Sequence, residues 1–267
     1  MSKNEDEDAW FQRTWTEREE RLWQLYGPSQ PAGSPAGHVL ALPAEVRLER
    51  PGSCVYVFPP CGGAERTPRA SWVYVSHGLT QPLEPCDEVD RSGDGWEFAV
   101  ETASAGDWAP LALQLFVEEV IAGAEFDVGH RVAGFFARHA GALIPFLGTP
   151  DMHQADPVGP LRWWLLFPHL RPWTELTCET GRFALLGAVG LCDDEFALLE
   201  DVNRCGYHLQ LLLCERGVGQ RTDPLRPSVL SEPEGRSAWE RIRRLSAPEA
   251  WGEVVARFSL PEGPTGS

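Results

Sequence analysis

Apolar side chains near the start of the chain recur at helical spacing. Between residues 7 and 26 the large apolar side chains share one stripe at i, i+4, i+11 and i+15, occupied by Phe11, Trp15, Leu22 and Tyr26. A Gly-Pro pair then ends the pattern, and residues 28–37 are rich in Pro, Gly and Ser. The pattern predicts an amphipathic helix and a linker, so the helix should pack as a separate arm or cap on the rest of the chain.

Short runs of aromatic and β-branched residues then predict strands. Clusters of Gly and Pro separate several of these runs, which span residues 54–58, 72–75, 96–100, 163–167 and 183–191. In the third run Trp96, Phe98 and Val100 alternate with Glu97 and Glu101. Such alternation is typical of a sheet with one covered face.

Helical patterns lie between and after these strands. They predict helices over residues 107–122, with Asp107 as the N-cap, over 193–203, and over 207–214, a segment that also fits a strand. Residues 217–233 are rich in Gly, Pro and Ser and predict a second linker. Two capping boxes, Ser237 with Glu240 and Ser246 with Glu249, then predict the starts of two C-terminal helices.

These elements predict an α+β fold in which a mixed β-sheet packs with helices. We expect an N-terminal helix and linker at 1–37, one α+β domain at 38–216, and a linker with a C-terminal helical extension at 217–267. With 43% hydrophobic residues the chain can build a sizeable core.

The charge balance narrows the possible partners. The chain has 39 acidic and 23 basic residues and a net charge of −16, which disfavours nucleic acid and anionic membranes and favours a cationic partner. The sequence contains no apolar run long enough to predict a membrane span, and the acidic N-terminus carries no apolar signal segment. Seven dispersed cysteines without a CxxC motif suit reduced thiols, so we expect a cytoplasmic protein.

The acidic residues concentrate in two segments. Residues 84–101 contain seven acids and one base, and residues 175–204 contain seven acids and two bases. If both segments face one side, they form an anionic surface that attracts a basic protein; the alternative is a pair of solvated acidic loops. The candidate partner-binding residues are Asp87, Glu88, Asp90, Asp94, Asp193, Asp194 and Glu195.

Motifs for catalysis and cofactor binding are not found. The histidines and cysteines lack zinc-like spacing, no GxSxG elbow occurs, and the two GxG pairs lack the helix and lysine of a phosphate-binding loop. We therefore predict no metal, no cofactor and no enzymatic activity. A hydrolase that uses Cys54 or Cys178 with a distant histidine is left as an alternative, because such partners meet in space rather than in sequence.

Several motifs follow one another in a recognisable order. They are SWVYVSHGLT at 71–80, GWEF at 95–98, WAPLALQLFVEEV at 108–120, FDVGH at 126–130, GRFALLGAVGL at 181–191 and DDEFALL at 193–199. Over about residues 10–215 this succession resembles the suppressor-of-fused-like domain family. The resemblance implies a non-enzymatic binding domain with a mixed sheet and helices.

The resemblance also carries a functional expectation. Eukaryotic members resemble a two-lobed clamp that holds an extended peptide by strand addition, whereas this chain is similar to the bacterial branch, whose domains look like immunity proteins of polymorphic toxin loci. The family's peptide-gripping residues correspond to the region of residues 81–94. We therefore expect an immunity protein that occludes the active site of a basic toxin, or alternatively an intracellular regulator or scaffold that binds an extended peptide by β-augmentation.

Overall fold

One mixed sheet contains every strand that the structure describes. The computed structural model describes residues 3–27, 38–39, 54–61, 69–82, 91–106, 108–132, 161–169, 175–201 and 206–246. Eight strands lie within these ranges: β1 (His38–Val39), β2 (Cys54–Phe58), β3 (Trp72–His77), β4 (Arg91–Thr102), β5 (Arg131–Val132), β6 (Leu161–Pro168), β7 (Leu176–Cys178) and β8 (Gly181–Cys192).

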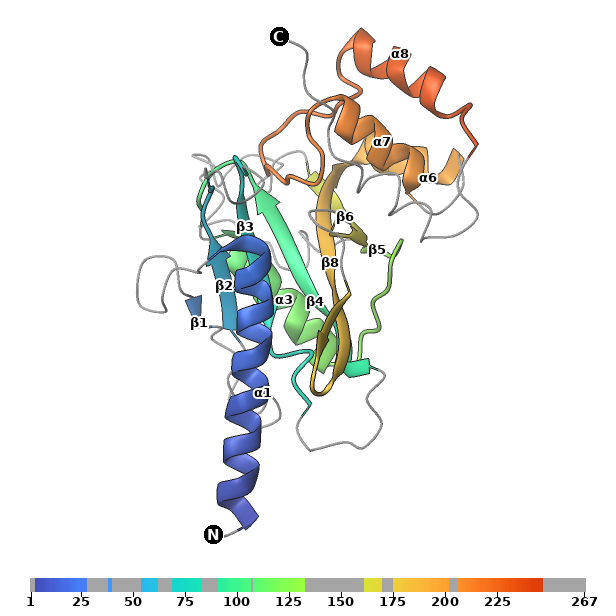
Figure 1. Cartoon of the computed structure of the whole chain (residues 1–267). Coiled ribbons are helices and arrows are strands. Elements are labelled where there is room, and N and C mark those ends of the chain that lie inside the picture. Colours follow the sequence, from blue (N-terminus) through green and yellow to red (C-terminus); the bar gives the residue numbers. More distant parts are fainter. Residues whose placement is uncertain are drawn as a thin grey trace, which may run out of the picture.

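The strand order makes β4 and β8 the centre of the sheet (Figure 1). The order is β1-β2-β3-β4-β8-β6-β5, and β7 pairs with β8 beside this path. All the neighbouring pairs are antiparallel except β4 and β8, which run parallel with Trp96 opposite Ala184 and Ala99 opposite Gly187. The mixed sheet confirms the predicted fold class.

Helices cover both faces of this sheet. The described helices are α1 (Lys3–Tyr26), α3 (Trp108–Ile121), α6 (Asp193–Asp201), α7 (Tyr207–Glu215) and α8 (Pro233–Ile242). Successive side chains of β8 point to opposite faces of the sheet. On one face, Leu186 and Ala188 share a core with α3. On the other face, Leu185 packs with α1, and Val189 packs with α7 and α8. Helix α3 therefore covers one face, and α1 and the C-terminal helices share the other.

Most of the predicted elements are present, but one helix start is wrong. The five predicted strands correspond to β2, β3, β4, β6 and β8, and the helices predicted at 7–26, 107–122, 193–203 and 207–214 correspond to α1, α3, α6 and α7. Helix α8 begins at Pro233 with Glu232 as its N-cap, so the capping box of Ser237 and Glu240 lies inside the helix. Proline is favoured in the first helical turn, where its missing N–H is not needed. Asp107, residues 202–203 and the helix expected after Ser246 lie outside the described residues.

The segment between α7 and α8 is held firmly although it contains no long element. The backbone N–H of Thr222 donates to Glu101 O (2.7 Å), and Thr222 Oγ1 accepts from the N–H of Gly190 (3.0 Å). Gln220 Nε2 donates to Pro168 O (2.8 Å). Residues 220–222 therefore bond to β4, to β8 and to the end of β6. The bonds to β4 and β8 lie past the last residues that those two strands pair, so this segment is fixed to the sheet.

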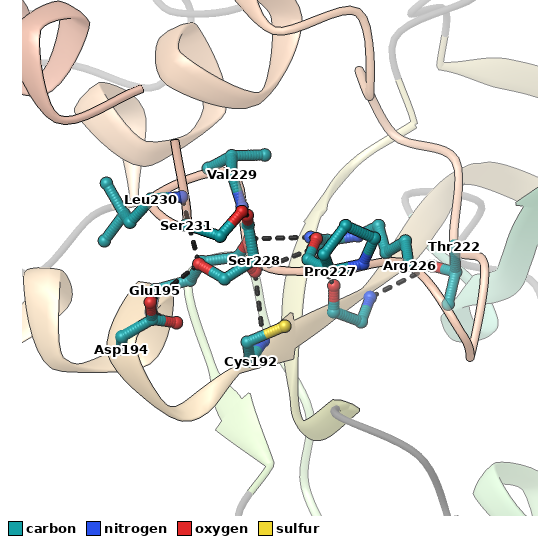
Figure 2. A network of polar contacts seen from close by, with 11 residues as sticks. Cys192, Asp194, Glu195, Thr222, Arg226, Pro227, Ser228, Val229, Leu230 and Ser231 are labelled. Carbon is teal, nitrogen blue, oxygen red and sulfur yellow. Dashed lines mark hydrogen bonds and ion pairs between the residues drawn. The ribbon is translucent and has the colours of Figure 1, made fainter. Parts of the chain in front are cut away.

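A buried ion pair fastens the same segment to the start of α6 (Figure 2). Arg226 donates from Nη1 to Glu195 Oε1 (2.6 Å) and from Nη2 to Glu195 Oε2 (2.7 Å). Glu195, with a side chain that is 0% exposed, also accepts from the backbone N–H groups of Cys192 (3.0 Å) and Val229 (2.8 Å). The carboxylate is thus fully compensated inside the protein, as a buried charge requires.

Helix α1 is anchored by polar side chains that the apolar stripe did not indicate. Thr14 and Arg18 are completely buried, whereas Phe11 and Trp15 are half-buried. Arg18 Nη1 donates to Thr14 O (2.6 Å) and Gln81 Oε1 (2.9 Å), and Nη2 bonds to the hydroxyls of Ser92 and Thr180. One guanidinium therefore joins α1 to the segment after β3, to β4 and to the turn before β8.

We expect the protein to tolerate the loss of one partner of the Arg226–Glu195 pair poorly. Arg226→Met should lower the free energy of unfolding by about 3–5 kcal/mol, because it leaves a buried carboxylate without a cation. Adding Glu195→Gln to that variant should recover part of the loss. Urea unfolding followed by circular dichroism measures both, with Arg241→Met, which removes the surface partner of Glu215, as the control. An equal loss in Arg241→Met and Arg226→Met would contradict this role.

We expect the burial of His77 to make the free energy of unfolding depend on pH. Its ring is 1% exposed, packs against Trp15 (ring centroids 4.0 Å apart) and Tyr56 (5.1 Å), and neither ring nitrogen has a hydrogen-bond partner in the described part of the chain. Burial, aided by the charge of Arg18, lowers the pKa of His77 from 6.5 to about 3. In the unfolded chain His77 binds a proton below pH 6.5, whereas in the folded protein it binds one only near pH 3. The folded state is therefore most stable, as far as His77 is concerned, above pH 6.5, and it loses stability as the pH falls from 6.5 towards 3.

The test compares the wild type with His77→Phe, which keeps an aromatic ring but does not titrate. Between pH 7 and pH 4.5 the wild type should lose about 2.5 kcal/mol more unfolding free energy than the variant, because the slope approaches about 1.4 kcal/mol for each pH unit below 6.5. Urea titrations at both pH values measure the difference. Identical pH slopes in the two proteins would show that His77 does not carry this effect.

Candidate functional site

A pocket of about 840 Å³ lies where the start of β4 meets the end of α3. It is lined by side chains and backbone of Leu79, Gly93, Asp94, Trp96, Phe98, Val120, Gly123, Ala124, Glu125, Phe126, Asp127 and His130. The lining thus comes from the turn after β3, from β4, and from the segment that connects α3 to β5.

Aromatic rings form the wall of the pocket. Trp96 and Phe98 point to the same face of the sheet because they are two residues apart on β4. Phe126 lies edge-on against Phe98 (ring centroids 5.5 Å apart) and against Phe116 of α3 (5.7 Å). The chain reaches this position because α3 ends at Ile121 and Gly123, two residues later, turns the backbone away with a φ of +96°.

Three carboxylates surround these rings. Asp94 is half-buried, and Glu125 and Asp127 are exposed. Asp127 Oδ1 accepts from the N–H of Val128 (2.7 Å), and His130 Nδ1 accepts from the N–H of Asp127 (3.0 Å). The lining contains no lysine or arginine, and neither Glu125 nor Asp127 forms an ion pair with the residues the structure describes. The pocket therefore combines apolar surface with a negative potential.

The position of Asp94 depends on a glycine. Gly93 adopts φ +53°, and a Cβ there would lie 2.5 Å from Leu79 O, so no larger residue fits. The N–H of Asp94 donates to Leu79 O (3.0 Å), which holds the bend against the turn after β3. Among the predicted partner-binding residues, Asp94 is the one that the structure places in this pocket.

The other predicted residues are distributed differently. Asp87, Glu88 and Asp90 lie outside the described residues. Asp193 and Asp194 are exposed, and they accept hydrogen bonds from Trp163 Nε1 (2.6 Å) and Ser228 Oγ (2.7 Å), respectively. Glu195 was expected at a partner surface, and this expectation is wrong, because its carboxylate is buried and bonded to Arg226.

The described parts of the two acidic segments do not form one anionic face. Asp94 lies near the start of β4, and Asp193 follows the end of β8, a strand of 12 residues that pairs in parallel with β4 near its own start. At ~3.3 Å per residue, these carboxylates lie at opposite ends of the sheet, roughly 30 Å apart along the strands. Two further acids are paired, Glu175 with Arg182 (3.1 Å) and Glu179 with Arg13 (2.9 Å). The sequence left open whether the two segments share a face, and the described acids do not support a shared face.

Sequence reasoning missed most of the pocket. Glu125, Asp127 and His130 belong to no acidic cluster and were not singled out as candidates. The available signal was the pair of motifs GWEF (95–98) and FDVGH (126–130), which both contribute to the lining. Helix α3 separates them in sequence, and its packing on the sheet brings them together.

Two further observations concern sites of other kinds. Within the described ranges, no group of three or more His, Cys, Asp or Glu side chains is arranged to hold a metal ion. No helix among those ranges is long and apolar enough to cross a membrane.

Solved structures share this fold, although sequence searches find no relative. No family model matches the sequence, and no curated protein matches it significantly. A chain of the Sufu–Fu complex crystal structure superposes with a TM-score of 0.59 at 15% identity, over 88% of this chain and 98% of that chain. A protein described as a SUFU (suppressor of fused protein) homologue from Neisseria gonorrhoeae gives 0.51 at 18% identity, over 81% and 97%.

Suppressor of Fused from Drosophila is also similar. Its TM-score is 0.58 at 17% identity, and the match covers 85% of this chain but 54% of the Drosophila chain. The fold is therefore that of suppressor-of-fused proteins, as the order of sequence motifs predicted. The chain spans about half the length of the Drosophila protein and nearly the whole length of the gonococcal one.

The two pocket glycines offer a matched test of the Asp94 bend. Gly93→Ala and Gly123→Ala both place a side chain at positive φ, which costs about 1–2 kcal/mol. Only Gly93 also meets backbone atoms, whereas a Cβ on Gly123 meets nothing within 4 Å. Thermal unfolding should therefore show a larger drop in Tm for Gly93→Ala. A Tm equal to that of Gly123→Ala would mean that the contact with Leu79 is not restrictive.

Proposed function

We propose that this chain is a protein-binding domain without catalytic activity, and that its partner is a basic toxin domain. Binding would neutralise the toxin by covering its active site, in the cytoplasm of the cell that makes both proteins. The observation that supports this most is the pocket with aromatic walls and three carboxylates. A suppressor-of-fused protein with the same fold occurs in complex with another protein, Fu.

The distribution of charge supports a cationic partner. The net charge is −16, and Asp94, Glu125 and Asp127 line one concave surface to which no described lysine or arginine contributes. A negative potential at a pocket steers a positively charged protein towards it and raises the association rate. Because Asp94 and Asp193 lie at opposite ends of the sheet, the proposal rests on this pocket and not on a continuous anionic face.

The perturbed titratable groups support a role without catalysis. Burial raises the pKa of the Cys54 thiol to about 12, so the nucleophilic thiolate is scarce at neutral pH. Burial also raises the pKa of Glu97, while hydrogen bonds from Ser76, Gly78 and Thr80 oppose that rise. Glu97 and His77 are enclosed in the core and do not line the pocket. Their shifts thus have structural causes, which weakens the case for a hydrolase.

Strand addition of an extended peptide is the second candidate. Strand β1 pairs with Cys54 and Val55 of β2 and, within the described ranges, with no further residue of that strand. A sheet edge that is covered over so short a length can accept another strand through backbone hydrogen bonds. Such binding depends little on charge, and this difference separates the two candidates.

The ionic strength dependence of association tests the proposal. A partner captured from the native lysate is identified, purified and mixed with the protein in stopped-flow experiments between 50 and 300 mM NaCl. For a basic toxin we expect the association rate to fall by about tenfold or more, because salt screens the attraction. The toxin's own activity should also be lost at an equimolar ratio.

Charge-reversal variants provide the control for this measurement. Glu125→Lys combined with Asp127→Lys should slow association, whereas Glu234→Lys on the exposed face of α8 should have a smaller effect. A toxin that stays active in the complex would overturn the neutralisation proposal. Tight binding of short extended peptides with no salt dependence would instead support strand addition.

A further inference from the structure

We infer that the pocket beside β4 binds the guanidinium group of an arginine side chain that the partner presents. This inference rests on the proposed function, since the arginine belongs to the bound protein. It specifies the chemistry of the site, which neither the fold nor its structural neighbours indicate.

The size and wall of the pocket suit a side chain with a planar end. Its volume of about 840 Å³ falls within the range of roughly 300–1,000 Å³ that is typical of pockets enclosing a ligand. Trp96, Phe98 and Phe126 supply aromatic surface, and Phe126 is held in place by two neighbouring rings. A guanidinium plane stacks on such rings with favourable cation–π attraction.

The carboxylates at the pocket supply the matching hydrogen-bond acceptors. A guanidinium carries five N–H donors in its plane, so it can stack on a ring while it donates to carboxylates at its edge. Glu125 and Asp127 are exposed residues that have no ion pair with described residues, and Asp127 Oδ1 accepts one hydrogen bond, from the N–H of Val128. Asp94 adds a third negative charge to the lining from β4.

The protein's own nearby arginine is engaged elsewhere. Arg131 follows His130 directly, but its guanidinium lies over the ring of Phe196, 5.6 Å from the ring centroid. Phe196 in turn stacks on Trp163 with a centroid distance of 3.8 Å. Among the described residues no lysine or arginine lines the pocket, so a partner's guanidinium can supply the cation.

Arginine fits this combination better than lysine. The lysine ammonium is compact and strongly hydrated, and it cannot stack as a plane on the aromatic wall. A neutral isostere such as citrulline keeps the shape of arginine but loses its charge. The site should therefore prefer arginine to lysine, and lysine to citrulline.

Short peptides with one variable residue test this order. Acetyl-Gly-Arg-Gly-amide, its lysine analogue and its citrulline analogue are titrated into ¹⁵N-labelled full-length protein at millimolar concentrations and followed by NMR. The arginine peptide should shift the Trp96 indole signal and the Gly123 amide signal in a saturable way. We expect affinity to fall a few-fold for lysine and at least tenfold for citrulline.

Variants of the pocket define the site. Glu125→Gln with Asp127→Asn should weaken the arginine peptide about tenfold, and Ala124→Phe should block it by filling the pocket without a change of charge. Glu234→Gln, which removes one exposed charge on α8, should bind like the wild type. Amide spectra of each variant establish that it is folded before the titration.

The outcomes separate this inference from the proposed function. Equal affinity for the arginine and citrulline peptides, or unchanged binding in Ala124→Phe, would overturn the guanidinium site. If the toxin still binds Ala124→Phe as tightly as the wild type, the inference is wrong and the proposed function stands. If the arginine preference is found but no basic protein binds, the site chemistry holds and the proposed function fails.

Discussion

The parallel pairing of β4 with β8 is the constraint on which the other features of the structure depend. Because the two strands run in the same direction, their starts lie at one end of the sheet and their ends at the other. The pocket forms at the first end, where β4 begins. At the second end, α6 follows β8, and residues 220–222 bond to both strands. This arrangement places Asp94 and Asp193 at opposite ends of the sheet, although both count equally in the net charge of the chain.

Many charged groups act inside the protein rather than on its surface. Arg18 joins α1 to three segments, and Glu195 fixes the segment before α8 through Arg226. Glu97 accepts hydrogen bonds from Ser76, Gly78 and Thr80 and so holds the turn after β3. Each buried charge is costly unless it is bonded, and these bonds make the arrangement specific. A partner therefore meets fewer charged side chains than the composition of the chain suggests. In the pocket, acidic side chains lie beside apolar side chains.

The pocket illustrates how a shared fold can carry its own recognition chemistry. Structural neighbours at 15–18% identity share the backbone arrangement, but such similarity says little about the side chains of a site. Here β4 supplies rings, and the turn after α3 supplies carboxylates. The sheet and the helix place both sets beside one pocket, which is the arrangement that the proposed recognition of a cation requires.

Local pattern determined which segments form elements, because helical and strand periodicities depend on near neighbours in the chain. It predicted α1, α3 and α7 and the main strands, and the order of motifs predicted the fold. It did not determine strand direction, so it left open whether the acidic segments share a face. It also did not indicate that Arg18 and Glu195 are buried or that Glu125 and Asp127 lie beside Trp96. Those features depend on contacts between segments far apart in the chain, and only the packed tertiary structure decides them.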